Sequence, residues 1–151
     1  MTDREQPWSD ESVPQGRILV LTDNPIARAI QDLATTVGRE VVVVAQDDGG
    51  PGIVAREGDA VVLCDHDAPD AAAVLRSALA GDAAYVAMMA SRRRAAGLLE
   101  ELAGEGVDTS RLHVPAGHDL GGKGPGEIAL SVVAEVVAES YGRSGGPMRG
   151  R

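Results

Sequence analysis

Short apolar runs alternate with segments of helical apolar spacing over most of this 151-residue chain. The runs are rich in valine, leucine and alanine, which is typical of strands buried on both faces of a parallel sheet. Five runs predict strands, at 17–21, 40–45, 60–64, 84–89 and 112–115. Four segments predict helices, at 25–37, 69–79, 92–103 and 125–139. Three of these helices have expected N-caps, which are Asn24, Asp67 and Ser91.

This alternation predicts one α/β domain of the three-layer Rossmann-like class, with a mainly parallel five-stranded sheet. Counting the strands along the chain, the expected order in the sheet is 3-2-1-4-5. The domain is expected at 17–141. Residues 1–16 and 142–151 are polar or glycine-rich and show no periodicity, so we expect two disordered tails.

Composition narrows the class of function. The formal net charge of −9 argues against a nucleic-acid partner, because nucleic acids bind basic surfaces. No apolar run reaches transmembrane length and no signal peptide is visible, so we expect a cytoplasmic protein without membrane contact. The single cysteine, Cys64, excludes an internal disulfide. We expect a buried, inert thiol, although its place beside the predicted ligand crevice also suits a persulfide or pterin-thiolate role.

In an open parallel sheet, ligands bind outside the carboxyl ends of the strands. The polar residues that follow the predicted strands are therefore the candidate cofactor-binding residues. They are Thr22, Asp23, Asn24, Asp47, His66, Ser91, Arg92, Arg93, Gly117, His118, Asp119 and Gly121. The turn at 22–25 has no glycine to let a pyrophosphate approach the backbone, and Asp23 would repel phosphate. We therefore interpret this turn as a helix cap rather than an NAD(P) site, although Asp47 could still hold a ribose hydroxyl.

Ser91, Arg92 and Arg93 form the best remaining anion site, together with the glycine-rich loop at 117–122. The backbone N–H and hydroxyl of Ser91 and one guanidinium would hold a phosphate or a pterin phosphate. The alternative is that Ser91 only caps its helix and that the arginines are solvated.

A metal site would need the loops that carry His66, His118 and the aspartates beside them to meet. No tight ligand spacing supports it, so no metal is expected. The chain also lacks a nucleophile–base pair and a P-loop, because Lys123 is not followed by the serine or threonine that such a loop requires. A binding or accessory protein is therefore expected rather than an enzyme.

Three segments in the second half of the chain carry a resemblance to a known family. Residues 85–93 read YVAMMASRR, residues 113–121 read HVPAGHDLG, and residues 127–135 read EIALSVVAE. In this order and spacing they are similar to motifs of the C-terminal Rossmann-like domain of the XdhC/CoxI proteins. The chain departs from the family pattern at Ala90 and His118, where the family usually has glycine and leucine, and in the glycine-free first turn.

The resemblance implies a maturation factor for molybdenum hydroxylases such as xanthine dehydrogenase or CO dehydrogenase. Such a factor binds the molybdenum cofactor, a pterin, and aids its loading. The implied partners are the hydroxylase itself or a separate protein with the family's N-terminal domain, which we do not expect in this chain. A homodimer is also possible. Two alternatives stay open, namely an NAD(P)-dependent oxidoreductase and a non-catalytic interaction subunit with a degenerate nucleotide site.

Overall fold

The computed structural model describes residues 16–44 and 54–149. Its elements are β1 (Ile18–Leu21), α1 (Pro25–Thr36), β2 (Val41–Val44), β3 (Ala60–Leu63), α2 (Ala71–Ala80), β4 (Tyr85–Met88), α3 (Arg92–Gly104), the 3-10 helix η2 (Thr109–Arg111), β5 (Leu112–His113) and α4 (Pro125–Ser140). Five strands and four α-helices therefore lie at the expected places, with ends that differ by one or two residues. Residues 1–15 of the predicted tail and the candidate Asp47 lie outside the described residues.

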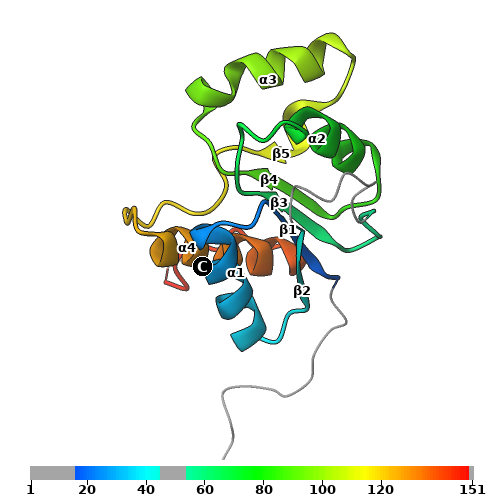
Figure 1. Cartoon of the computed structure of the whole chain (residues 1–151). Helices are drawn as coiled ribbons and strands as arrows, with labels where there is room; N and C mark the ends of the chain where they lie inside the picture. The colour runs from blue at the N-terminus through cyan, green and yellow to red at the C-terminus, as the bar shows by residue number, and fades with distance from the viewer. Residues whose placement is uncertain (1–15, 45–53, 150–151) are drawn as a thin grey trace, which may run out of the picture.

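The strands form one all-parallel sheet with helices on both faces (Figure 1). Helices α2 and α3 cover one face, and α1 and α4 cover the other. Successive strand residues point to opposite faces: Leu19 and Val61 pack under α2 and α3, whereas Ile18 and Val62 pack under α1 and α4. The three-layer Rossmann-like class is confirmed.

The expected strand order is wrong, because the sheet runs β2-β1-β3-β4-β5. β1 pairs with both β2 and β3, and β3 pairs with β4. In this order α2 joins neighbouring strands by a short crossover, whereas the order 3-2-1-4-5 would need a connection across two strands. All four residues of β3 are buried and those of β2 are only half-buried, so β2 is the edge strand. Both strands are apolar runs, so the sequence does not show which of the two lies at the edge of the sheet.

Two expected N-caps are confirmed and one is wrong. The Asn24 side chain accepts a hydrogen bond from the Ala27 N–H at 2.9 Å. The Ser91 hydroxyl accepts one from the backbone N–H three residues on at 3.1 Å. Asp67, however, does not cap α2, whose N-cap is Asp70. The Asp67 N–H donates to the Asp65 carboxylate at 3.0 Å, and this local turn delays the start of the helix.

A buried ion pair closes the amino ends of the strands. Asp59 is 2% exposed and accepts from the Arg17 guanidinium at 2.6 Å and from the Arg17 and Arg56 N–H groups, each at 2.8 Å. Burial raises the pKa of Asp59, but the hydrogen bonds from Arg17 and Arg56 outweigh it and hold that pKa below its ordinary value. Asp59 therefore stays ionised and ties the start of β1 to the start of β3.

The chain continues past α4 without regular secondary structure over residues 142–149. This segment turns back along α4 toward the loop that precedes that helix (Figure 1). The disordered tail expected over 142–151 stays a prediction. Among the helices of the described residues, none has the length and apolar character needed to cross a membrane.

Candidate functional site

An open pocket of about 790 Å³ lies at the carboxyl ends of β4 and β5. Its walls come from the turn after β3, the start of α3, the loop between β5 and α4, and the first two turns of α4. The charged and polar residues that line it include His66, Ser91, Arg94, Asp119, Lys123 and Glu127. The parallel sheet explains this gathering, because it brings the carboxyl ends of all strands to one edge.

The structure brings half of the sequence-based candidates together in this pocket. Those that line it are His66, Ser91, Gly117, His118, Asp119 and Gly121. Thr22, Asp23 and Asn24 lie after β1 and do not line it. Arg92 and Arg93 are exposed and also lie outside the lining, whereas Arg94, which is absent from the candidates, belongs to it. The choice among three successive arginines depends on the rotation of α3, which the sequence does not state.

Four charged side chains of the pocket have no ionic partner. Among the described residues, none forms a hydrogen bond or ion pair with the side chains of Arg94, Asp119, Lys123 or Glu127. The Glu127 carboxylate lies against Gly122, where a Cβ atom would overlap it. Two unpaired cations and two unpaired carboxylates can hold a ligand that carries both an anionic group and hydrogen-bond donors.

A carboxylate whose side chain is 13% exposed anchors the loop that forms the pocket wall. Glu135 of α4 accepts a hydrogen bond from the Tyr85 hydroxyl and another from the Gly117 N–H at 3.2 Å. Nδ1 of His113 lies 3.6 Å from the same Glu135 oxygen, and the rings of His113 and Tyr85 stack with centroids 4.6 Å apart. Burial, and then the hydrogen bond to Glu135, raise the pKa of Tyr85, so its hydroxyl stays a donor.

The sequence reading missed this role of Glu135 and Tyr85. One signal was present, because Glu135 interrupts the apolar stripe of α4 between Val132 and Val136. A carboxylate on a core-facing stripe requires a buried donor. The partner lies 50 residues away along the chain, so the sequence alone could not name it.

Gly117 is required by backbone geometry. Its φ is +97°, a conformation that residues with a Cβ rarely adopt, and a Cβ would collide with the Ser131 hydroxyl. The next residue, His118, donates its N–H to the Ser131 carbonyl at 3.3 Å. The loop is therefore fastened to α4 at two successive residues.

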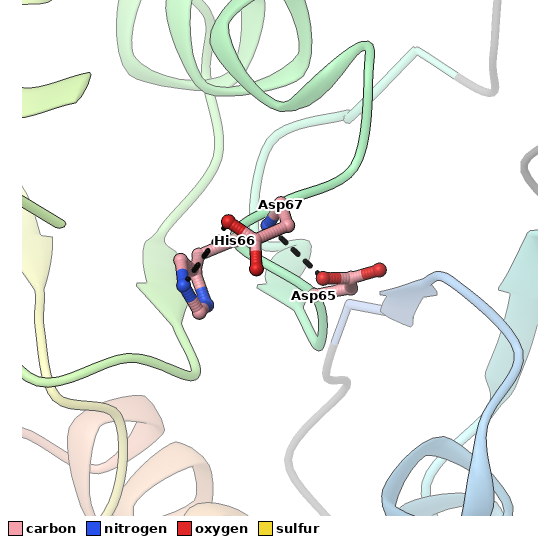
Figure 2. Close-up of side chains that lie close together, drawn as sticks. All are labelled: Asp65, His66 and Asp67. Atoms are coloured by element: carbon pink, nitrogen blue, oxygen red, sulfur yellow. Dashed lines mark hydrogen bonds and ion pairs between the residues drawn. The ribbon is translucent and has the colours of Figure 1, made fainter. Parts of the chain in front are cut away.

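Asp65, His66 and Asp67 form a small group at the pocket's edge (Figure 2). One ligand atom from each lies within 4.8 Å of the others, and Nε2 of His66 is 3.3 Å from the Asp67 carboxylate. His118 and Asp119, which the sequence suggested as further ligands, do not join this group. The three residues could offer a hard divalent cation two carboxylates and one imidazole.

The first turn after β1 is closed by its own side chains. Thr22 has a φ of +73°, the left-handed conformation that a glycine would occupy in a dinucleotide-binding turn. The Asn24 side chain donates to the Cys64 carbonyl at 3.2 Å, which bridges β1 and β3 where the strand order reverses. Asp23 pairs with Arg28 at 3.0 Å. The side chains of Asp23 and Asn24 are therefore both engaged in contacts within the fold.

Cys64 directly follows β3, and its carbonyl accepts the hydrogen bond from Asn24. Burial, and then the nearby Asp65 carboxylate, raise the pKa of Cys64 to about 12. The thiol is therefore protonated at neutral pH, which does not favour a role as a thiolate ligand.

Comparison with known proteins identifies the family. The model of the XdhC Rossmann domain matches residues 18–136. The uncharacterized protein YqeB of Escherichia coli is 38% identical over an alignment of 68 residues, and the match covers 43% of this chain and 13% of that protein. A crystal structure described as a xanthine dehydrogenase from Bacillus halodurans superposes with a TM-score of 0.71 at 21% identity, and the match covers 87% of this chain and 44% of that one. The chain thus spans less than half the length of either relative, and the structural likeness shows the fold. Because the family model covers most of the chain, the protein belongs to the XdhC Rossmann domain family.

Proposed function

We propose that this chain is a ligand-binding accessory module that aids the loading of molybdenum cofactor into a molybdenum hydroxylase. The observation that carries the proposal is the open pocket with unpaired Arg94, Lys123 and Glu127 side chains. Membership of the XdhC family supports the proposed class of cargo, and the relative described as a xanthine dehydrogenase supports the proposed class of client.

The pocket residues fit this cargo by charge and size. The molybdenum cofactor joins a pterin ring, whose edge carries N–H donors, to a phosphate. Arg94 and Lys123 would hold the phosphate, and Glu127 would accept hydrogen bonds from the pterin edge. A volume of about 790 Å³ lies within the range of small-molecule sites. The role of these residues is to bind and orient the cofactor, and the redox chemistry belongs to the client enzyme.

NAD(P) fits the chain less well. Its usual place is the turn after β1, where Asn24 bridges to Cys64 and no glycine opens the backbone. We therefore infer weak binding of NAD(P) at best and place the oxidoreductase function second.

The proposal is tested by calorimetric titration with molybdopterin, comparing Arg94→Ala with Arg92→Ala. Loss of one charge-assisted contact at Arg94 should weaken binding by about 10- to 150-fold. Arg92 lies in the same helical turn but outside the pocket lining, so its variant should bind like the wild type. Equal affinity in all three proteins would remove the pocket from consideration. A dissociation constant for NAD(H) near about 1 μM would instead favour the oxidoreductase.

Partners follow from the same proposal. The chain would act on a molybdenum hydroxylase in the cytoplasm, either alone, as a homodimer, or with a separate protein that supplies the rest of an XdhC-type factor. Co-purification of the tagged chain with a hydroxylase apoenzyme, and loss of client activity on its deletion, would support this role. Should the client acquire its cofactor normally without the chain, the interaction-subunit alternative would take its place.

A further inference from the structure

The segment after α4 lies on the loop that forms the pocket wall. We refer to residues 142–148 as the C-terminal strap. Gly145 of the strap sits so close to the His118 ring that a Cβ on this glycine would overlap Nε2. A second hollow of about 530 Å³ lies between the loop residues 118–120 and the strap residues 144–147. The same three loop residues line the main pocket, so the strap contacts the pocket wall from its outer side.

The strap is fastened at its base and rests on the loop by packing. Its backbone N–H groups donate to the last turn of α4, from Gly142 to Glu139 at 3.0 Å and from Arg143 to Ala138 at 2.8 Å. Farther along, Gly146 donates only to Ser144 within the strap, at 3.3 Å. No hydrogen bond between described residues joins the strap to loop 117–122. All strap residues are exposed, so little apolar burial holds them down.

The contact covers a polar atom that has no partner. Within residues 16–44 and 54–149, Nε2 of His118 is the single buried side-chain nitrogen or oxygen without a hydrogen bond. Burial of a polar group without a hydrogen-bond partner raises the free energy, so the closed arrangement is destabilised at His118. This destabilisation disappears when the strap moves away and Nε2 meets water or a ligand.

We propose that the C-terminal strap is an autoinhibitory cover over His118 and the pocket loop. In the closed arrangement it restrains residues 117–122 and keeps Nε2 of His118 from solvent. Its release exposes Nε2 of His118 and frees the loop to admit a ligand. The proposal concerns the loop itself and does not depend on which ligand the pocket binds.

Hydrogen exchange and limited trypsin digestion of the full chain test this proposal. Gly145→Ala adds a methyl group against His118 at a φ of +78°, so it should lift the strap. Gly146→Ala is the matched control, because its Cβ would meet only Ser144 of the strap itself. We expect the two hydrogen-bonded amides of the loop, those of Gly117 and His118, to exchange about tenfold faster in Gly145→Ala, which corresponds to about 1.4 kcal/mol of lost protection. Cleavage after Lys123 should accelerate similarly.

Each result decides for or against the strap. Faster exchange of the loop amides in Gly145→Ala alone, with an unchanged urea midpoint of unfolding, supports the proposal. Wild-type exchange in Gly145→Ala would show that the strap does not restrain the loop. Equal acceleration in both variants would also overturn it, because the contact with His118 would then not be the restraint. Since no ligand is added, failure here leaves the proposed cofactor role untouched.

Discussion

Replacing Glu135 should uncouple the pocket loop from the core. One oxygen of Glu135 accepts hydrogen bonds from the Tyr85 hydroxyl on β4 and from the Gly117 N–H in the loop. Glu135→Ala removes the acceptor and leaves both donors in place. Tyr85 is only 3% exposed, so water cannot easily replace the lost partner there, whereas Gly117 is half-buried and water can reach it.

The size of the effect follows from these two donors. A buried donor that loses its acceptor costs about 1–3 kcal/mol, and a donor that water reaches costs much less. Glu135→Ala should therefore lower the free energy of unfolding by about 2–3 kcal/mol. Glu135→Gln keeps one acceptor oxygen but loses the charge and exchanges the second oxygen for an NH2 group, so a loss of about 1 kcal/mol is expected. Tyr85→Phe removes one donor and should cost about 1.5 kcal/mol.

Urea unfolding of the two single variants and the double variant measures the coupling. Because Glu135→Ala and Tyr85→Phe break the same hydrogen bond, the double variant should be about 1–2 kcal/mol more stable than the sum of the single losses predicts. The urea dependence of the free energy should stay that of the wild type, so that midpoints compare directly. Additive losses, or a loss below about 0.5 kcal/mol in Glu135→Ala, would refute the anchoring role.

Three further predictions concern other parts of the fold. Thr22→Gly should raise the free energy of unfolding by about 0.5 kcal/mol in urea, because it relieves about 1–2 kcal/mol of left-handed backbone strain. This relief exceeds the stabilisation that the unfolded chain gains from the extra entropy of glycine. Thr22→Ala keeps the strain and should not stabilise the protein. The pKa of the Cys64 thiol is raised to about 12, so its contribution to the free energy of unfolding should be fully present below about pH 8.5. Above that pH the free energy of unfolding should fall by up to about 1.4 kcal/mol per pH unit, and Cys64→Ala should lack this slope. The pKa of Asp59 is lowered, so its share is present above about pH 4 and lost as the pH falls further; Asp59→Asn should flatten that acid dependence and lower the urea midpoint at pH 7.

Local sequence signals accounted for the elements and for one edge of the site. Asn24 and Ser91 cap helices through bonds to residues three positions away, which a short window of sequence contains. Half of the candidates taken from the glycine-rich loop and the polar turns after the strands do line the pocket, because parallel strands must end at a common edge.

The structure also gave the family motifs a physical meaning. His113, Gly117, Ser131 and Glu135 stand at fixed places in the segments that resemble the family, and in the fold they fasten one loop to one helix. Of these four residues, only Gly117 was expected from the sequence to lie beside a ligand. Their contacts instead show that much of the motif serves to hold the pocket wall.

Tertiary structure decided what depends on contacts between distant residues. The strand order follows from which faces β3 can bury, and the runs of β2 and β3 are too alike for their composition to reveal it. The selection of Arg94 over its two neighbours follows from how α3 docks on the sheet. The partners of Glu135 come from residues 18 and 50 positions away. The local sequence pattern determines which backbone conformation a segment adopts. Strand pairing and helix docking depend instead on how the whole chain buries its apolar residues, and these long-range contacts complete the site.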